Sequence, residues 1–223
     1  MPALTMLVVS LMGAWLLCAV LGVVASRTLA THALGVAARR KHIVRLNVFG
    51  NALAILQCTA LAASYALIIR REPVVQQWPL TLHIALFASI LGYIVLALVR
   101  WLLPDLPVSH ALKRLAGVYL IAVIAVWLMI STVGVWRINA IASLWYFVAI
   151  GLLAMSLMLS GFSRPYFRGA ITVAQHICKH GSHARREATL KRLLAKWYPL
   201  LAVSAAVMVT TALLLIYRPA MLG

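Results

Sequence analysis

Three histidines in the long polar stretch Ser163–Trp197 have a spacing that suits metal binding. They are His176, His180 and His183, in the sequence HICKHGSH. On a continuous helix, residues three or four positions apart lie on the same face, so the three rings would point in similar directions. Imidazole nitrogen is a common ligand of zinc, copper and iron. The spacing therefore indicates a candidate metal site.

Three further histidines, predicted on the same side of the membrane, extend this candidate ligand set: His32, His42 and His110. The corresponding hypothesis is a metal-dependent, histidine-ligated membrane enzyme, or a protein that handles a metal or haem, with its site on cytoplasmic loops. Integral-membrane di-iron hydroxylases and desaturases also gather histidines on one membrane face. They use paired HxxHH-type boxes, whereas no HH dipeptide occurs in this chain.

A solvated helix face explains the same histidines without any cofactor. Gly181 disturbs a helix between His180 and His183. The opposite face of the segment is an apolar stripe that is suited to lying in the membrane interface. Its residues are Ala170, Val173, Ala174, Ile177 and Cys178. We favour this interpretation, under which the protein holds no cofactor.

A second candidate site is a polar face on the second predicted helix. Asn47, Asn51, Cys58 and Tyr65 share this face, and Tyr93 follows in the third helix. Polar side chains that face the interior of a helix bundle can line a substrate path. They more often form hydrogen bonds between helices, worth about 1 kcal/mol each. Both interpretations stay open at this point.

Acidic residues are too few and too peripheral for most enzyme or ion-coupling chemistry. The chain has three, Glu72, Asp105 and Glu187, and all three fall in predicted loops. Ion-coupled transporters usually place ionisable groups in the middle of the membrane. The chain also lacks a P-loop, a nucleotide-binding glycine pattern and a nucleophile elbow. A non-enzymatic function is therefore favoured.

The composition indicates the elements that must position these residues. The chain of 223 residues is 65% hydrophobic and only 10% charged, against about 25% charged residues in soluble domains. Its apolar runs reach the roughly 20 residues that cross a bilayer as a helix. We therefore predict one all-α, polytopic integral-membrane domain over residues 1–223 with six spans. They are Ala3–Ser26, Leu46–Ile69, Leu80–Leu103, Leu115–Trp136, Ala140–Phe162 and Tyr198–Tyr217, with Pro165 ending the fifth helix.

The distribution of positive charge predicts the orientation. With these spans, sixteen of the twenty Lys and Arg fall on one side, and such an excess marks the cytoplasmic side. Both termini are then non-cytoplasmic, in a cell inner (plasma) membrane. The net charge of +17 follows this topology, and no nucleic-acid recognition motif accompanies it.

The basic loop 163–197 has a helix that could bind lipid or protein. In Arg185–Trp197, one face is formed by Leu190, Leu193, Leu194 and Trp197. The basic residues on its other faces are Arg185, Arg186, Lys191, Arg192 and Lys196. The expected partner is the anionic head groups of the cytoplasmic leaflet or an acidic protein. Small residues at four-residue spacing in the spans also allow a homo-oligomer.

Residues 1–136 resemble the four-helix arrangement of the copper-resistance D and protoporphyrinogen-oxidase-J-like membrane proteins. The resemblance lies in AARRKHIVRLN, LHIAL and KRLAGVYLIAVIAVWLM. Those families are marked by a histidine in the first helix, and the porphyrinogen oxidases by a lysine in the third. The corresponding spans here contain neither, so the resemblance implies an arrangement of helices and no functional residue.

The sequence therefore favours a non-enzymatic subunit of a membrane assembly, or a small permease. A subunit requires a protein partner. A permease requires an internal cavity lined by residues such as Asn51 or Tyr93. The competing class is the metal-dependent protein described above.

Overall fold

The computed structural model describes residues 2–31, 35–71, 73–102 and 144–217, together with scattered residues between 111 and 129. Within these residues the regular structure is helical, and no strand occurs. The helices are α1 (Pro2–Leu29), α2 (Val36–Arg71), α3 (Pro73–Gln76), α4 (Leu80–Leu102), α6 (Leu144–His180) and α7 (Ala184–Tyr217).

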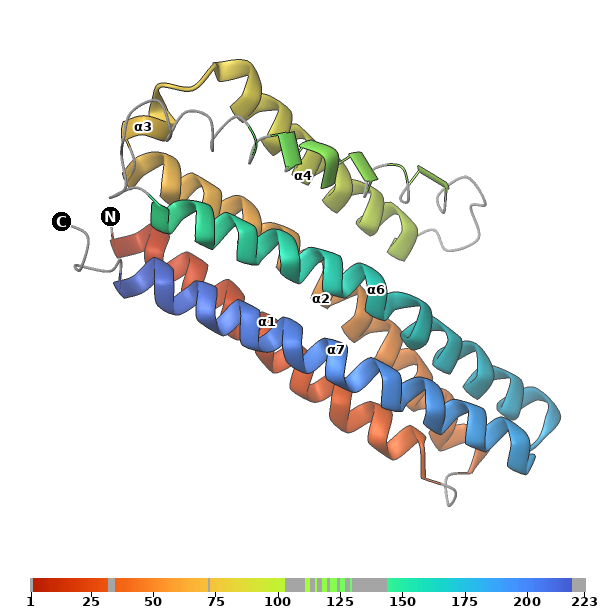
Figure 1. Cartoon of the computed structure of the whole chain (residues 1–223). Helices are drawn as coiled ribbons and strands as arrows, with labels where there is room; N and C mark the ends of the chain where they lie inside the picture. The colour runs from red at the N-terminus through yellow and green to blue at the C-terminus, as the bar shows by residue number, and fades with distance from the viewer. Residues whose placement is uncertain are drawn as a thin grey trace.

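Four of these helices form an antiparallel bundle of two hairpins. The α1–α2 hairpin packs against the α6–α7 hairpin through α2 on α6 and α1 on α7 (Figure 1). The helix α4 lies outside this bundle and packs against α2. The described beginning of α1 and the end of α7 lie together at one end of the bundle (Figure 1).

The buried faces of the bundle helices follow a heptad repeat. In α7 the buried residues recur at alternating spacings of four and three: Leu190, Leu194, Trp197, Leu201, Ser204, Met208, Thr211 and Leu215. The same alternation in α1 gives Val8, Met12, Trp15, Ala19, Gly22, Ser26 and Leu29. Residues repeating every 3.5 positions keep one seam of each helix toward its neighbours along the whole bundle. The seams therefore explain why these helices pack along their full lengths.

The helix α6 continues through Pro165, so the prediction that this proline ends the fifth helix is wrong. Pro165 lies inside α6, and Pro199 lies inside α7. A proline removes one backbone hydrogen bond and crowds the preceding turn. Both prolines are exposed, with buried heptad residues before and after them. Packing on both sides of each proline stabilises the helix against this local cost.

The polar stretch 163–197 is a helical hairpin and not a loop on the membrane surface. Its turn is Gly181–His183, and Gly181 has φ of 81°, a left-handed conformation that glycine adopts readily at a helix end. Ala170, Ala174 and Ile177 are buried in the bundle core. The prediction that this apolar stripe lies in the membrane interface is therefore wrong, because α7 and the rest of the bundle cover it.

Within the described part of the chain, five helices are long and apolar enough to cross a membrane. They are Ala3–Leu29, Val36–Arg71, Leu80–Val99, Val148–His180 and Ala184–Tyr217. The all-helical, multi-pass part of the prediction is thus confirmed. The predicted span Leu115–Trp136 lies largely outside the described residues. Six spans, the side of the termini and the identity of the membrane stay predictions.

The three long bundle helices exceed the thickness of a membrane. α2, α6 and α7 have 36, 37 and 34 residues, so each is about 50–56 Å long at 1.5 Å per residue. A hydrocarbon core is about 30 Å thick. The residues of these helices that lie outside the predicted spans are mostly at the end of the bundle that carries most of the Lys and Arg. We call residues 36–45, 163–180 and 184–197 the basic extension.

Candidate functional site

A buried ion pair holds the basic extension together. Arg39 Nη1 of α2 donates to Glu187 Oε1 of α7 at 2.7 Å, and the two side chains are only 4% and 3% exposed. Ser182 Oγ also donates to Glu187 Oε1, at 3.1 Å. Because α1 ends at Leu29, the extension consists of three helices at this level. The pair therefore crosses the core of the extension and ties α2 to the start of α7.

A polar cluster joins α2, α6 and α7 farther along the bundle. Gln57 Nε2 donates to Ser156 Oγ at 2.7 Å, and Ser160 Oγ donates to Gln57 Oε1 at 2.7 Å. Ser156 and Ser204 share a hydrogen bond of 2.9 Å between their hydroxyls. Both ends of the Gln57 amide are thus satisfied inside the bundle. We call these four residues the Gln57 cluster.

A small cavity lies beside the Gln57 cluster, and residues of all four bundle helices line it. Its volume is about 50 Å³, and its wall includes Trp15, Gln57, Ser160, Arg164, Phe167 and Trp197. The backbone of Gly50 forms another part of the wall. The Phe167 and Trp197 rings pack together with centroids 5.0 Å apart. We call this space the core cavity.

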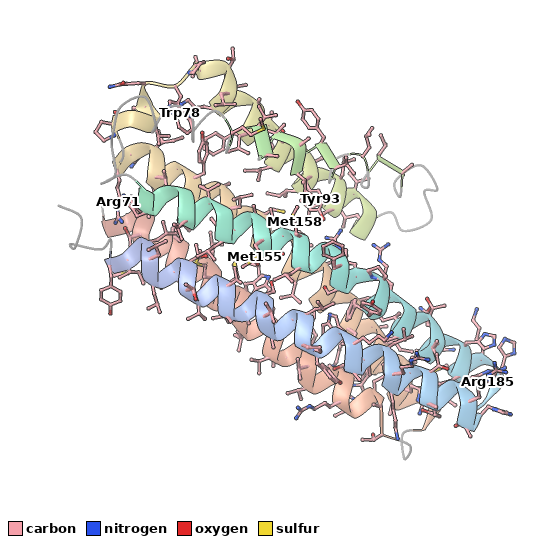
Figure 2. All side chains as sticks on the ribbon, viewed as in Figure 1. Arg71, Trp78, Tyr93, Met155, Met158 and Arg185 are labelled. Carbon is pink, nitrogen blue, oxygen red and sulfur yellow. The ribbon has the colours of Figure 1, made fainter. Side chains whose placement is uncertain are left out.

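The end of the molecule opposite the basic extension is held together by an arginine and by contacts between aromatic rings. Arg71 Nη1 donates to the Leu215 carbonyl at 2.6 Å, and its Nη2 donates to Thr5 Oγ1 at 2.9 Å. Arg71 and Arg185 thus lie at opposite ends of the bundle (Figure 2). Near this end the Tyr65 hydroxyl bonds His83 Nδ1 at 2.7 Å. The His83 ring stacks on Trp78.

The predicted path residues differ in their burial and are spread over α2 and α4. Cys58, Tyr65 and Tyr93 are buried, whereas Asn51 is half-buried and Asn47 is exposed. None of the five lines the core cavity or the apolar groove of about 640 Å³ between α2 and α4. The hydrogen bond between Tyr65 and His83 joins α2 to α4, which is the role of interhelical contact that the sequence left open.

Two of the six candidate metal ligands approach each other. The rings of His176 and His180 have centroids 4.4 Å apart, and both side chains are exposed. His183 Nδ1 accepts a hydrogen bond from the Arg185 backbone N–H, and His42 bonds Thr28. His32 and His110 lie outside the described residues. Within the part of the chain that is described, no three His, Cys, Asp or Glu residues are placed to hold a metal.

The residues predicted to contact lipid or a partner lie on the outer surface of α7. Arg185, Lys191, Arg192 and Lys196 are exposed, and Arg186 is half-buried. Lys196 Nζ lies 5.6 Å from the centroid of the Tyr166 ring, a cation–π contact with α6. The heptad face of α7 points inward, so these charges face away from the bundle core.

Sequence reasoning missed the ion pair and the Gln57 cluster. Glu187 was assigned to a loop, and Gln57 lay between the residues of the predicted polar stripe. The available signal was the heptad register. Counting back from Leu190 and Leu194 by the same alternation gives Glu187, and counting along α2 from Arg39 through Ile43 and Leu46 leads to Gln57.

The comparisons with known families, with characterised proteins and with solved structures gave no match to the chain.

Proposed function

We propose that the protein is a non-catalytic subunit of a membrane assembly, and that its basic extension binds an acidic segment of a protein partner. The observation that carries the proposal is the length of the extension. The residues of α7 that precede the predicted last span number fourteen, Ala184–Trp197, which corresponds to about 21 Å of helix. The corresponding part of α6 is longer.

The tip of the extension is the turn between α6 and α7, with Lys179, Arg185 and Arg186 beside it. The length of the extension separates this tip from lipid head groups. The interfacial layer on each side of a bilayer is about 5–8 Å thick. The attraction of basic residues to an anionic leaflet falls off within a Debye length, about 8 Å at physiological salt. Lys196 therefore lies within reach of the head groups, whereas Arg185 and Arg186 lie beyond it. We therefore expect the basic residues at the tip to bind a soluble acidic segment of a partner protein.

The extension is also suited to binding because its surface is held in place. Its core contains Ile177, Leu190 and Leu194, each at most 3% exposed, together with the Arg39–Glu187 pair. A surface that is ordered before binding loses little further conformational entropy when a partner docks. Its one described carboxylate, Glu187, is engaged by Arg39 and Ser182.

Neutralising the tip is expected to weaken partner binding about tenfold. The variant is Lys179→Gln/Arg185→Gln/Arg186→Gln, and each exposed ion pair that it removes contributes up to about 1 kcal/mol. The measurement is the fluorescence anisotropy of a labelled Asp/Glu-rich peptide titrated with the full chain in mild detergent. Native purification then tests whether the natural partner is lost in parallel.

The matched control removes the same charge closer to the membrane. Lys191→Gln/Arg192→Gln/Lys196→Gln is expected to reduce flotation with anionic vesicles and to leave peptide binding within about twofold of the wild type. Equal peptide binding by the tip variant and the wild type would contradict the proposal. A chain that purifies alone from its native membrane at physiological salt would also contradict it.

A metal-handling function is the second candidate, because the ring centroids of His176 and His180 are 4.4 Å apart. Two imidazoles alone leave the usual four-coordinate zinc site incomplete, so this candidate needs further ligands. We expect protein purified without a polyhistidine tag to hold less than one zinc, iron or copper per chain by elemental analysis. Stoichiometric metal that disappears in His176→Ala/His180→Ala would replace the subunit proposal with the metal-dependent one.

A further inference from the structure

The wall of the core cavity includes one hydrogen-bond donor that lacks an acceptor among the described residues. Trp15 lines the cavity and is 1% exposed, and its Nε1–H has no hydrogen-bond partner within the described part of the chain. A buried donor without an acceptor costs about 1–3 kcal/mol. Such a group among the residues that line a cavity indicates that a molecule in the cavity accepts its hydrogen bond.

A positive charge lies in the same wall. Arg164 lines the cavity, and its guanidinium carbon lies 5.6 Å from the centroid of the Tyr93 ring. Among the described residues no carboxylate lies within salt-bridge distance of Arg164. The ring contact stabilises the cation but does not neutralise it.

The acceptors near the cavity are already engaged. Gln57 Oε1 accepts from Ser160, and the Ser160 carbonyl accepts from Ser163 Oγ at 3.0 Å. Arg164 also hydrogen-bonds the Tyr93 side chain, and its remaining N–H groups, together with the indole N–H, suit an anion. Arginine in particular binds the oxygens of phosphate and carboxylate groups through charge-assisted hydrogen bonds.

One part of the cavity wall lies at the ends of the predicted spans, whereas Trp15 and Gln57 in another part lie near the middle of theirs. Ser163 and Arg164 follow directly after the predicted fifth span, and Trp197 directly precedes the predicted last span. Tryptophan is enriched at this level of membrane proteins. The volume of about 50 Å³ is several times the roughly 10–15 Å³ that one water requires, so a small oxyanion group fits.

We propose that the core cavity binds a phosphate group, carried either by an anionic phospholipid or by a free phosphate ion. The site is separate from the tip of the basic extension and does not depend on the proposed partner. Trp15 Nε1 and the Arg164 guanidinium hold the phosphate oxygens, and Phe167 and Trp197 enclose the group.

The test uses the full chain in maltoside detergent, which contains no phosphate. Phosphatidylglycerol, a diacylglycerol with the same tails, and inorganic phosphate are added separately, and the midpoint of thermal unfolding is recorded. We expect phosphatidylglycerol or inorganic phosphate to raise the midpoint and diacylglycerol to leave it unchanged. A response to phosphatidylglycerol alone identifies the lipid as the source, and a response to inorganic phosphate identifies a soluble ion.

Variants assign the effect to the cavity. Arg164→Gln is expected to weaken the apparent affinity for the phosphate-containing probe at least tenfold. Trp15→Phe removes the N–H donor and part of the ring system, and it is expected to weaken the affinity several-fold. Arg168→Gln is the matched control, because Arg168 is exposed one turn farther along α6 and its loss changes the net charge equally. If Arg164→Gln fails to fold, the affinity of Arg164→Lys, which keeps the charge, is measured in its place.

Two results would overturn the proposal. One is the absence of any shift with both phosphate-containing probes in the wild type, which would leave only water in the cavity. The other is an equal loss of affinity in Arg164→Gln and Arg168→Gln, which would reduce the effect to net charge.

Discussion

Glu187→Leu is expected to destabilise the protein by about 3–5 kcal/mol. The substitution leaves the Arg39 guanidinium buried without its carboxylate, and an unpaired buried charge is among the most costly defects in a folded protein. Arg39 is 3% exposed and its ion-pair distance to Glu187 is 2.7 Å, so water cannot easily replace the lost partner. The measurement is the free energy of unfolding in mixed detergent micelles, followed by circular dichroism.

A double variant shows whether the loss of stability comes from the unpaired charge of Arg39 or from the loss of the ion pair itself. Arg39→Met/Glu187→Leu removes both charges, and an apolar pair of similar volume in a buried site is often as stable as the ion pair. We therefore expect the double variant to recover most of the lost stability. Arg40→Met changes the exposed neighbour of Arg39 and should stay within about 0.5 kcal/mol of the wild type. A loss in Glu187→Leu no larger than that in Arg40→Met would contradict the buried pair.

The helical, multi-pass architecture was predictable because composition and length determine it almost alone. Apolar runs of about 20 residues can satisfy their backbone groups in a bilayer only as helices or closed barrels. The α1 and α4 regions illustrate this, because their predicted spans lie close to the observed helices Pro2–Leu29 and Leu80–Leu102.

The ends of the long helices were not predictable from local rules. Pro165 was expected to stop a helix, and the basic residues before Leu46 were expected to form a loop. Both expectations considered only the neighbours of each residue in the sequence. In the folded chain α6 continues to His180 and α2 begins at Val36, because packing between helices outweighs the local cost of a proline or a charge.

The same reason explains what sequence reasoning found and missed in the sites. The exposed charges of α7 were identified correctly as an outer face, because amphipathic spacing within one helix is a local property. The contact between Arg39 and Glu187 joins residues 148 positions apart, so it depends on how two hairpins pack. The His176–His180 approach is local and was predicted, whereas the position of His42 beside Thr28 depends on the α1–α2 turn.

Gly50→Ala is expected to destabilise the protein by about 1–3 kcal/mol, although alanine is the better helix former. A Cβ atom at Gly50 would lie 2.5 Å from Phe167 Cε1 and 3.0 Å from its Cζ. Overpacking of this kind forces side chains or helices to shift. The Phe167 ring also contacts Trp197, so it cannot move away without disturbing the core cavity. The midpoint and free energy of unfolding in detergent measure the effect.

Gly151→Ala provides the matched control within the bundle. A Cβ atom there would meet nothing within 4 Å, so the substitution should raise stability by up to about 1 kcal/mol through helix propensity alone. Gly50→Ala/Phe167→Leu is expected to lose less than the sum of its two single variants, because the smaller side chain removes the clash. Strict additivity would mean that α2 and α6 do not meet at Gly50. The opposite signs expected for two glycine-to-alanine changes thus distinguish close helix contact from a general effect of glycine in helices.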